Sequence, residues 1–437
     1  MFGRTRRNAS GRGRTTSFAA AALAGVLALA GCGGDGGSND SSEVEVFSWW
    51  TGPGEAEGLT ALQALFEKQN PGTKFVNAAI AGGSGTQAKA VLSSRLQNRK
   101  PPDSFQGHAG AELLDYIKAG QIEPLNDFYD ENGLRDVYPK QLLDQITYKG
   151  SIYSVPVNIH RSNVLWYNPG ILEDAGVDGP PESIDAFIEA LKAVDAETDK
   201  VPLSLGAQWT ADHLLENVLL GSLGTEAYNA LWQPGANWDT PAVGAALDDF
   251  AEIMKYTTAE AASTDWQGAA KAVVDGRAAF NIMGDWAYGY FVNPAPNGLA
   301  KKQGTDFDHA PAPGTDGTYM WLSDSFTLPE NAPHRGGALA WLKTVASKEG
   351  QDAFNPKKGS IPARTDGDKS LYKGYLEYAI TEWNKPGIKL AGSFWHGVTA
   401  NNKWHTDIDT AVGLFLQHKD PAKLRQALVQ AARNSGQ

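Results

Sequence analysis

Cysteine is almost absent from this chain, which has one cysteine in 437 residues. A single thiol excludes an intramolecular disulfide framework and a zinc site built from several thiolates. Basic residues are outnumbered, since 38 Lys and Arg against 50 Asp and Glu give a formal net charge of −12. Such a balance does not suit nucleic acid or anionic lipid, and we expect no nucleic-acid partner. Beyond about the first 30 residues, no apolar run is long enough to cross a bilayer.

The single cysteine, Cys32, closes a Leu-Ala-Gly-Cys run that matches the bacterial lipobox. Five arginines precede it, followed by an apolar stretch over residues 18–30 that is too short for a mature transmembrane helix. This pattern predicts a lipoprotein signal peptide over residues 1–31, with lipid on the Cys32 thiol after cleavage. The Gly/Ser-rich residues 32–43 are then a flexible tether. We expect an extracytoplasmic protein held to the bacterial cell membrane by lipid, with Sec and Tat export both open.

The first part of the folded chain alternates between strand-like and helix-like segments. Strands are predicted over residues 44–50, 74–79 and 103–106, and helices over residues 55–70 and 86–98. This alternation predicts an α/β domain with a largely parallel sheet. In such sheets ligands bind beyond the carboxyl ends of the strands, where Trp49, Trp50, Gln106 and His108 lie.

The pattern changes after two β-rich segments, residues 151–157 and 163–167, which we interpret as strands separated by a polar stretch at 158–161. From about residue 168 the chain is mostly helical, which predicts a helix-rich second lobe. Two further strands are predicted over residues 279–283 and 323–328. The last stretch, from about residue 366, is predicted to be helical again.

Several segments, taken in order, resemble one known family. They are VEVFSWWTGPGEAEGL at 44–59, NIHRSNVLWYN at 158–168, GRAAFNIMGDWA at 276–287, LSDSFTLP at 322–329 and FNPKKGSIPAR at 354–364. With the lipoprotein signal, they resemble the extracellular solute-binding proteins of carbohydrate ABC transporters. In detail they are similar to the branch that binds glucose or galactose.

This resemblance implies an α/β fold of the periplasmic-binding-protein type II, with two lobes and a ligand cleft between them. The implied N-terminal lobe comprises residues 44–163 plus 323–362, and the implied C-terminal lobe comprises residues 164–322 plus 363–437. The lobes are expected to close on a sugar without chemistry. No cofactor, metal or catalytic residue is implied.

Sugar rings present C–H faces that stack on flat aromatic side chains, and the chain has 13 Trp and 14 Tyr. The aromatic candidates for the sugar site are Trp49, Trp50, Trp266 and Trp286. The alternative for each is a place in the core. Adjacent residues of a strand point to opposite faces, so one at most of Trp49 and Trp50 faces the ligand unless the strand has already ended.

Sugar hydroxyls need several polar partners, and charged side chains make the stronger hydrogen bonds. The polar candidates are Glu55, Gln106, His108, Asn158, Asp324, Lys358 and His396. The resemblance to the family implies that Gln106, His108, Asp324, Lys358 and His396 line the cleft. The alternatives are a first-turn helix carboxylate for Glu55, which the helix dipole favours, and a hinge position for Asn158.

These observations predict a monomeric receptor that captures a monosaccharide, glucose or galactose, for an ABC permease. A receptor for a di- or oligosaccharide is the nearest alternative. A secreted glycoside hydrolase would draw its two carboxylates from Glu55, Asp285 and Asp324. An anion or peptide receptor would use the backbone N–H groups of residues 82–85. The chain has no HExxH or GxSxG motif, and its eight histidines lack metal-ligand spacing in the sequence.

Overall fold

The computed structural model describes residues 40–257, 264–294, 296 and 298–436. They belong to one compact unit of the chain, residues 37–437. In this described part, no helix combines the length and the apolar character that a bilayer crossing needs. The predicted signal peptide and Cys32 lie outside the described residues, as does the tether up to residue 39.

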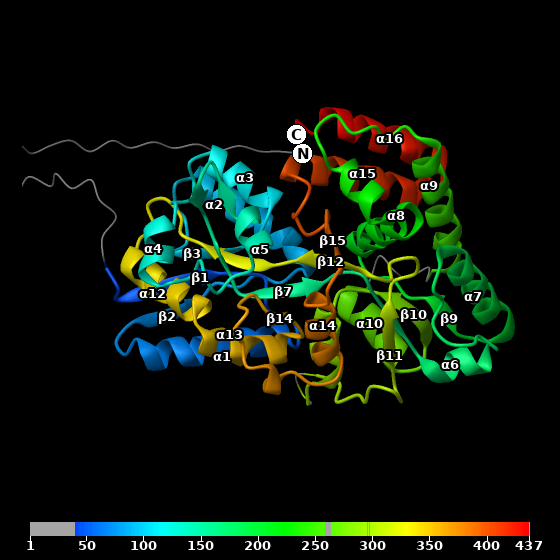
Figure 1. Cartoon of the computed structure of the whole chain (residues 1–437), viewed down its shortest axis with the longest axis horizontal. Helices are drawn as coiled ribbons and strands as arrows, with labels where there is room; N and C mark the ends of the chain where they lie inside the picture. Colours follow the sequence, from blue (N-terminus) through cyan, green and yellow to red (C-terminus); the bar gives the residue numbers. More distant parts are fainter. Residues whose placement is uncertain (1–39, 258–263, 295, 297, 437) are drawn as a thin grey trace, which may run out of the picture. The chain divides into compact units, whose positions relative to one another are not determined.

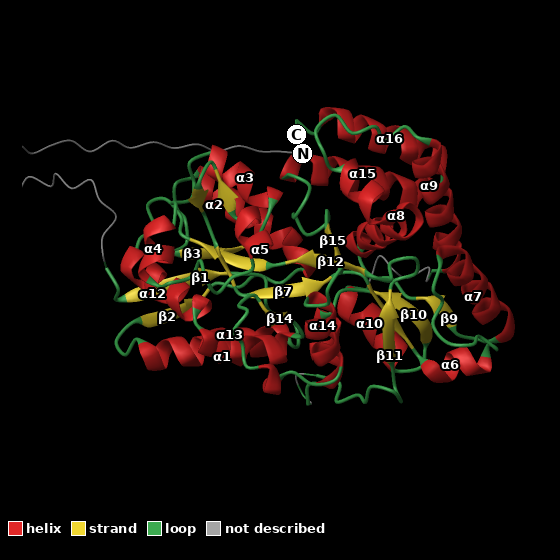
Figure 2. Cartoon of the chain, viewed as in Figure 1, coloured by secondary structure: helices red, strands yellow, loops and turns green. Residues whose placement is uncertain are grey.

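Three sheets organise the described chain (Figures 1 and 2), together with the short hairpin of β4 and β5. The strands are β1 Glu43–Phe47, β2 Lys74–Asn77, β3 Ser104–His108, β4 Thr147–Tyr148, β5 Ser151–Ile152, β6 Val155–Pro156, β7 Asn158–Arg161, β8 Val164–Tyr167, β9 Val201–Leu203, β10 Ala278–Ile282, β11 Asp308–Pro311, β12 Thr318–Leu322, β13 Asp324–Thr327, β14 Ile361–Pro362 and β15 Lys389–Gly392.

The first sheet has the order β2-β1-β3-β13-β6. Its β1 runs parallel to both β2 and β3, as the alternating pattern predicted. However, β13 is antiparallel to β3 and to β6, so the sheet is mixed rather than largely parallel. The late strand β13 therefore lies between β3 and β6, two strands from much earlier in the chain.

The other two sheets have the orders β11-β8-β10-β9 and β14-β7-β12-β15. The chain passes from the first sheet to the β8 sheet through β7, and it returns through β12 directly into β13. These two connecting strands pair with each other antiparallel, with Leu322 opposite His160. The β7–β12 pair thus joins the five-stranded sheet to the β8 sheet.

Helices cover the sheets. They are α1 Glu55–Gln69, α2 Thr86–Gln97, α3 Ala111–Lys118, α4 Asn126–Glu131, α5 Lys140–Gln145, α6 Pro169–Asp174, α7 Ile184–Glu197, α8 Gln208–Leu231, α9 Pro241–Ile253, α10 Trp266–Val274, α11 Trp286–Val292, α12 Arg335–Ala346, α13 Lys348–Lys358, α14 Tyr375–Trp383, α15 Asn402–His418 and α16 Pro421–Asn434, with short 3-10 turns at Gly83–Gly85 (η1), Met254–Tyr256 (η2) and Lys369–Leu371 (η4).

Two strands contradict the sequence predictions. Residues 158–161, interpreted as a polar separator, form β7, because their polar side chains are buried with partners instead of being solvated. Arg161 donates from Nη2 to the Thr318 carbonyl at 3.1 Å and from Nε to the Asn163 amide oxygen at 3.1 Å. The stretch after residue 366, predicted to be helical throughout, also contains β15, which pairs parallel with β12.

Candidate functional site

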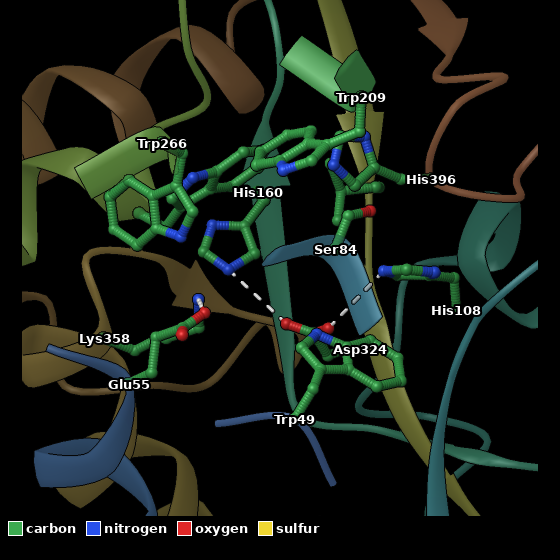
Figure 3. A pocket seen from close by; sticks show the side chains of 12 residues that line it. Trp49, Glu55, Ser84, His108, His160, Trp209, Trp266, Asp324, Lys358 and His396 are labelled. Atoms are coloured by element: carbon green, nitrogen blue, oxygen red, sulfur yellow. Dashed lines mark hydrogen bonds and ion pairs between the residues drawn. The ribbon is translucent and has the colours of Figure 1, made fainter. Parts of the chain in front are cut away.

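A cavity of about 330 Å³ lies where strand ends and helix starts from all three sheets converge (Figure 3). Its walls are indole rings, imidazoles and charged groups. The lining residues are Trp49, Glu55, Ser84, His108, His160, Trp209, Trp266, Trp286, Leu322, Asp324, Lys358 and His396. Eight of the eleven residues proposed from the sequence are among them: Trp49, Glu55, His108, Trp266, Trp286, Asp324, Lys358 and His396.

The two adjacent tryptophans, Trp49 and Trp50, lie in different surroundings. Because β1 ends at Phe47, both lie beyond the strand, yet only Trp49 lines the cavity. Trp50 is 1% exposed and packs in the core, with its ring 4.6 Å from that of Phe354 and 5.5 Å from that of Phe326. The expectation that Trp50 lines the site is therefore corrected.

Three cavity tryptophans stand at the starts of helices: Trp209 in α8, Trp266 in α10 and Trp286 in α11. One carboxylate positions two of them. Asp265, the residue before α10, accepts from the Trp266 backbone N–H at 2.8 Å and from the Trp209 indole N–H at 3.2 Å. The sequence analysis missed Trp209, although its position at a helix start is shared with the two that were selected.

The Gly-rich turn at residues 82–85 packs against two of these rings. A Cβ on Gly83 would stand 2.6 Å from the Trp209 indole nitrogen, and one on Gly85 would stand 2.7 Å from the Trp49 ring. Gly85 also has a φ of 73°, which favours glycine. This close approach brings Ser84 to the cavity wall.

Asp324 is the central carboxylate of the site. Its Oδ1 accepts from the Gln106 side-chain amide and its Oδ2 from that of Asn158, both at 2.8 Å. Gln106 and Asn158 thus lie behind the cavity lining and hold Asp324 in place. The sequence analysis expected both side chains to contact the ligand directly, whereas in the structure they act through Asp324. Burial alone would raise the pKa of Asp324, but the hydrogen bond and charge of His160 and the charge of Lys358 hold that pKa well below its ordinary value.

Two histidines face Asp324 from opposite sides, as the dashed lines in Figure 3 show. The His108 Nε2 lies 3.8 Å from Asp324 Oδ1, and the His160 Nε2 lies 3.5 Å from Oδ2. A second carboxylate orients each ring: Glu112 Oε2 is 2.8 Å from His108 Nδ1, and Asp285 contacts His160 Nδ1. His160 was not among the selected site residues, because its place in a hinge segment explained its polarity equally well.

The electrostatics behind these two rings differ. Burial would lower the pKa of His160, but the charge and hydrogen bond of Asp285 raise it above the ordinary value. On the other side, burial would raise the pKa of Glu112, yet Lys89 and His108 hold it far below the ordinary value. Glu112 thus carries a negative charge behind His108, whereas burial raises the pKa of Asp285 behind His160. The Nε2 atoms of both imidazoles are directed towards Asp324.

An ion pair forms another part of the wall. Lys358 Nζ, in the last turn of α13, lies 3.1 Å from Glu55 Oε1 in the first turn of α1. Burial raises the pKa of Glu55, and the Lys358 charge counteracts only part of that rise. The ammonium group also lies 5.9 Å from the Trp286 ring, within cation–π range.

His396 lies in the segment between β15 and α15, beside the indole rings. Its ring is 5.1 Å from that of Trp286 and 5.6 Å from that of His108. Burial, together with the charges of neighbouring cationic groups, lowers the pKa of His396 well below its ordinary value. The imidazole is therefore neutral at pH 7 and offers one donor and one acceptor.

The arrangement as a whole suits a ligand that has both apolar faces and many hydroxyl groups. The indole rings offer flat apolar surfaces, while Asp324 accepts hydrogen bonds, Lys358 donates them and His396 does either. An ion would meet both signs of charge at close range, because Asp324 and Lys358 line the same cavity. The residue types therefore favour a neutral polyhydroxylated ligand over an anion.

Comparison with known proteins gives a consistent result. The profile of a family described as bacterial extracellular solute-binding protein matches residues 40–352. The chain is 34% identical to the xylose/arabinose-binding protein XacG of Haloferax volcanii, over 79% of this chain and 74% of that protein. It is 32% identical to a probable sugar-binding periplasmic protein of Rhizobium meliloti, over 88% of this chain and 89% of that protein.

Among solved structures, the chain is similar to a chitin oligosaccharide binding protein, with a TM-score of 0.78 and 20% sequence identity. The match covers 90% of this chain and 99% of that structure. This likeness confirms the predicted fold class, a two-lobed α/β fold of the type II periplasmic-binding kind.

Proposed function

We propose that this chain, which belongs to the bacterial extracellular solute-binding protein family, captures a monosaccharide for import by an ABC transporter. Glucose and galactose are the ligands we favour. The observation that carries the proposal is the combination of four indole rings with an ionised carboxylate, an ammonium group and three imidazoles around one cavity.

The size of the sugar is the finer part of the proposal. The indole ring of Trp209 lies 6.3 Å from the imidazole ring of His396 and belongs to the same wall as Trp286. The names of the relatives range from xylose and arabinose to chitin oligosaccharides. A di- or oligosaccharide is therefore the second candidate.

The proposed mechanism is hinge closure without chemistry. With the lobe boundaries expected from the sequence, Trp49, Glu55, His108, Asp324 and Lys358 belong to one lobe. Trp209, Trp266, Trp286 and His396 belong to the other. A sugar that contacts both sets favours the closed form to the extent that it binds this form more tightly.

The lipid anchor and the partner complete the proposal. Lipid on Cys32 would keep a monomeric receptor at the membrane surface, where the permease of the transporter takes over the sugar. Mass spectrometry of the protein from membranes tests the anchor. A diacylglycerol adduct on Cys32 is expected, and an unmodified N-terminus upstream of Cys32 would contradict it.

Isothermal titration tests the ligand directly. The chain without residues 1–32, stripped of carried-over sugar by partial unfolding and dialysis, is titrated with glucose, galactose, mannose, xylose and maltose. A one-to-one response to a hexose at submicromolar concentration is expected. A response to maltose alone would favour the oligosaccharide receptor, and no heat with any sugar would contradict sugar binding altogether.

A further inference from the structure

His396 in the cavity wall also belongs to a compact group with two side chains that lie outside the cavity lining. His213 and Glu216 come from α8, three residues apart and hence on one face of the helix. His396 approaches from the segment after β15, some 180 residues later in the chain. All three are buried, and one ligand atom from each lies within 4.8 Å of the others.

The distances between these atoms approach those of a metal site. Four ligands at bonds of about 2.0–2.1 Å in a tetrahedron stand about 3.3 Å apart. Glu216 Oε1 is 3.4 Å from His213 Nδ1 and 4.0 Å from His396 Nδ1. The first pair therefore already has nearly the separation required, and the second exceeds it by about 0.7 Å (4.0 − 3.3).

Neighbouring groups hold the carboxylate in place. The hydroxyl groups of Ser162 and Ser393 donate to Glu216 Oε1 at 2.7 and 2.9 Å, and the Trp395 backbone N–H donates to Oε2 at 3.2 Å. Such outer partners orient the ligands of metal sites.

We infer that His213, Glu216 and His396 form a binding site for a divalent transition-metal ion, with Zn²⁺ as the best fit. Two imidazole nitrogens and one carboxylate are a ligand set that zinc uses with a fourth position open. The proposed metal site shares His396 with the cavity lining, whereas His213 and Glu216 lie outside that lining, so loss of zinc binding and loss of sugar binding can be measured separately. The spacing in the sequence did not indicate this group, because α8 and the segment after β15 bring its members together only in three dimensions.

Zinc titration of the full-length chain in detergent tests this site. The protein is purified without a histidine tag, freed of metal with a chelator and titrated with Zn²⁺ in competition with a fluorescent zinc indicator. One ion per chain is expected to bind. Removal of a ligand in Glu216→Gln or His213→Asn is expected to weaken zinc binding by more than about 100-fold, because even outer-shell losses cost 10–100-fold.

The control is His309→Gln, which removes a histidine that lies beside Asp308 and outside this cluster. This variant is expected to bind zinc like the wild type. Tryptophan fluorescence verifies the fold of each variant. If Glu216→Gln does not fold, Co²⁺ is added to the wild type, where intense visible bands of tetrahedral cobalt are expected. No stoichiometric zinc binding, unchanged affinity in a folded Glu216→Gln, or a cobalt spectrum of purely aqueous type would each overturn the inference.

Discussion

At the scale of the residue, the site is organised by pairs in which one side chain orients another. Glu112 orients His108, Asp285 orients His160, and the amides of Gln106 and Asn158 hold Asp324. Buried polar groups that are already paired keep one geometry, and a ligand with a wrongly placed hydroxyl leaves one of them unsatisfied. Discrimination between similar sugars then depends on these partners as much as on the groups that line the cavity.

Replacement of Trp286 tests the aromatic wall. Trp286→Ala removes a ring that contacts His160, His213 and His396 at the cavity. We expect sugar binding to weaken by about 2–4 kcal/mol, the loss typical of a buried hot-spot residue. Isothermal titration with the sugar identified for the wild type gives the value. Trp383→Ala, in α14 and outside the cavity lining, is the control and should keep the wild-type affinity.

Acid sensitivity is expected from His405. Burial lowers the pKa of this imidazole to about 3, while its Nε2 lies 3.0 Å from the Trp395 carbonyl. The unfolded chain therefore takes up a proton near pH 6.5 that the folded chain does not. The stabilisation is complete above that pH and is lost as the pH falls, at about 1.4 kcal/mol per pH unit.

Urea unfolding at pH 7 and pH 4.5 measures this effect. The free energy of unfolding of the wild type is expected to fall more steeply than that of His405→Gln, which keeps an N–H donor but does not titrate. Equal losses in the two proteins would assign the acid sensitivity to other groups.

At the scale of the element, local pattern predicted the helices and the outer strands well. The helix expected over 55–70 is α1 at Glu55–Gln69, and the strand expected over 74–79 is β2 at Lys74–Asn77. Their apolar spacing is a property of the local sequence. By contrast, β7 was missed, because its Asn, His and Arg side chains are satisfied by residues more than 100 positions away.

The residues of the site could likewise be predicted only where a local motif marks them. Trp266, Trp286 and Asp324 were selected from motifs, and the structure places all three at the cavity. Whether Trp50 faces the cavity or the core depends on the residue at which β1 ends, which alternation alone does not fix to within a residue. Trp209 joins the wall through Asp265, a contact between separate helices that no sequence spacing reveals.

The Gly-rich turn supplies a test at this scale. Gly85→Ala combines strain at a positive φ with a Cβ 2.7 Å from the Trp49 ring, whereas Gly120→Ala has similar strain, with nothing within 4 Å of its Cβ. Both variants are expected to lose about 1 kcal/mol of stability, the cost of a left-handed conformation for alanine. Only Gly85→Ala is expected to lose sugar affinity, by about tenfold or more, which is 1.4 kcal/mol.

Thermal unfolding and isothermal titration of the two variants separate strain from displacement of Trp49. If Gly120→Ala weakened sugar binding as much as Gly85→Ala, backbone strain rather than the contact with Trp49 would be responsible.

At the scale of the whole molecule, the cavity draws on segments from Trp49 to His396, so no contiguous fragment contains the site. If the sugar closes the two lobes, it should stabilise the chain and make it more compact. At a sugar concentration of about 100 Kd we expect about 2.7 kcal/mol of added stability and a smaller radius of gyration. Small-angle scattering and thermal unfolding measure the two effects, and both should be clearly smaller in Trp286→Ala at the same concentration.

The strand β7 has a consequence of its own. It connects the five-stranded sheet to the β8 sheet. Because alternate residues of a strand share a face, it also presents Asn158 and His160 together to Asp324. If the proposed closure bends the chain at β7, the same four residues act both as hinge and as part of the sugar site. A substitution in β7 that alters the sugar preference would then alter the opening motion as well.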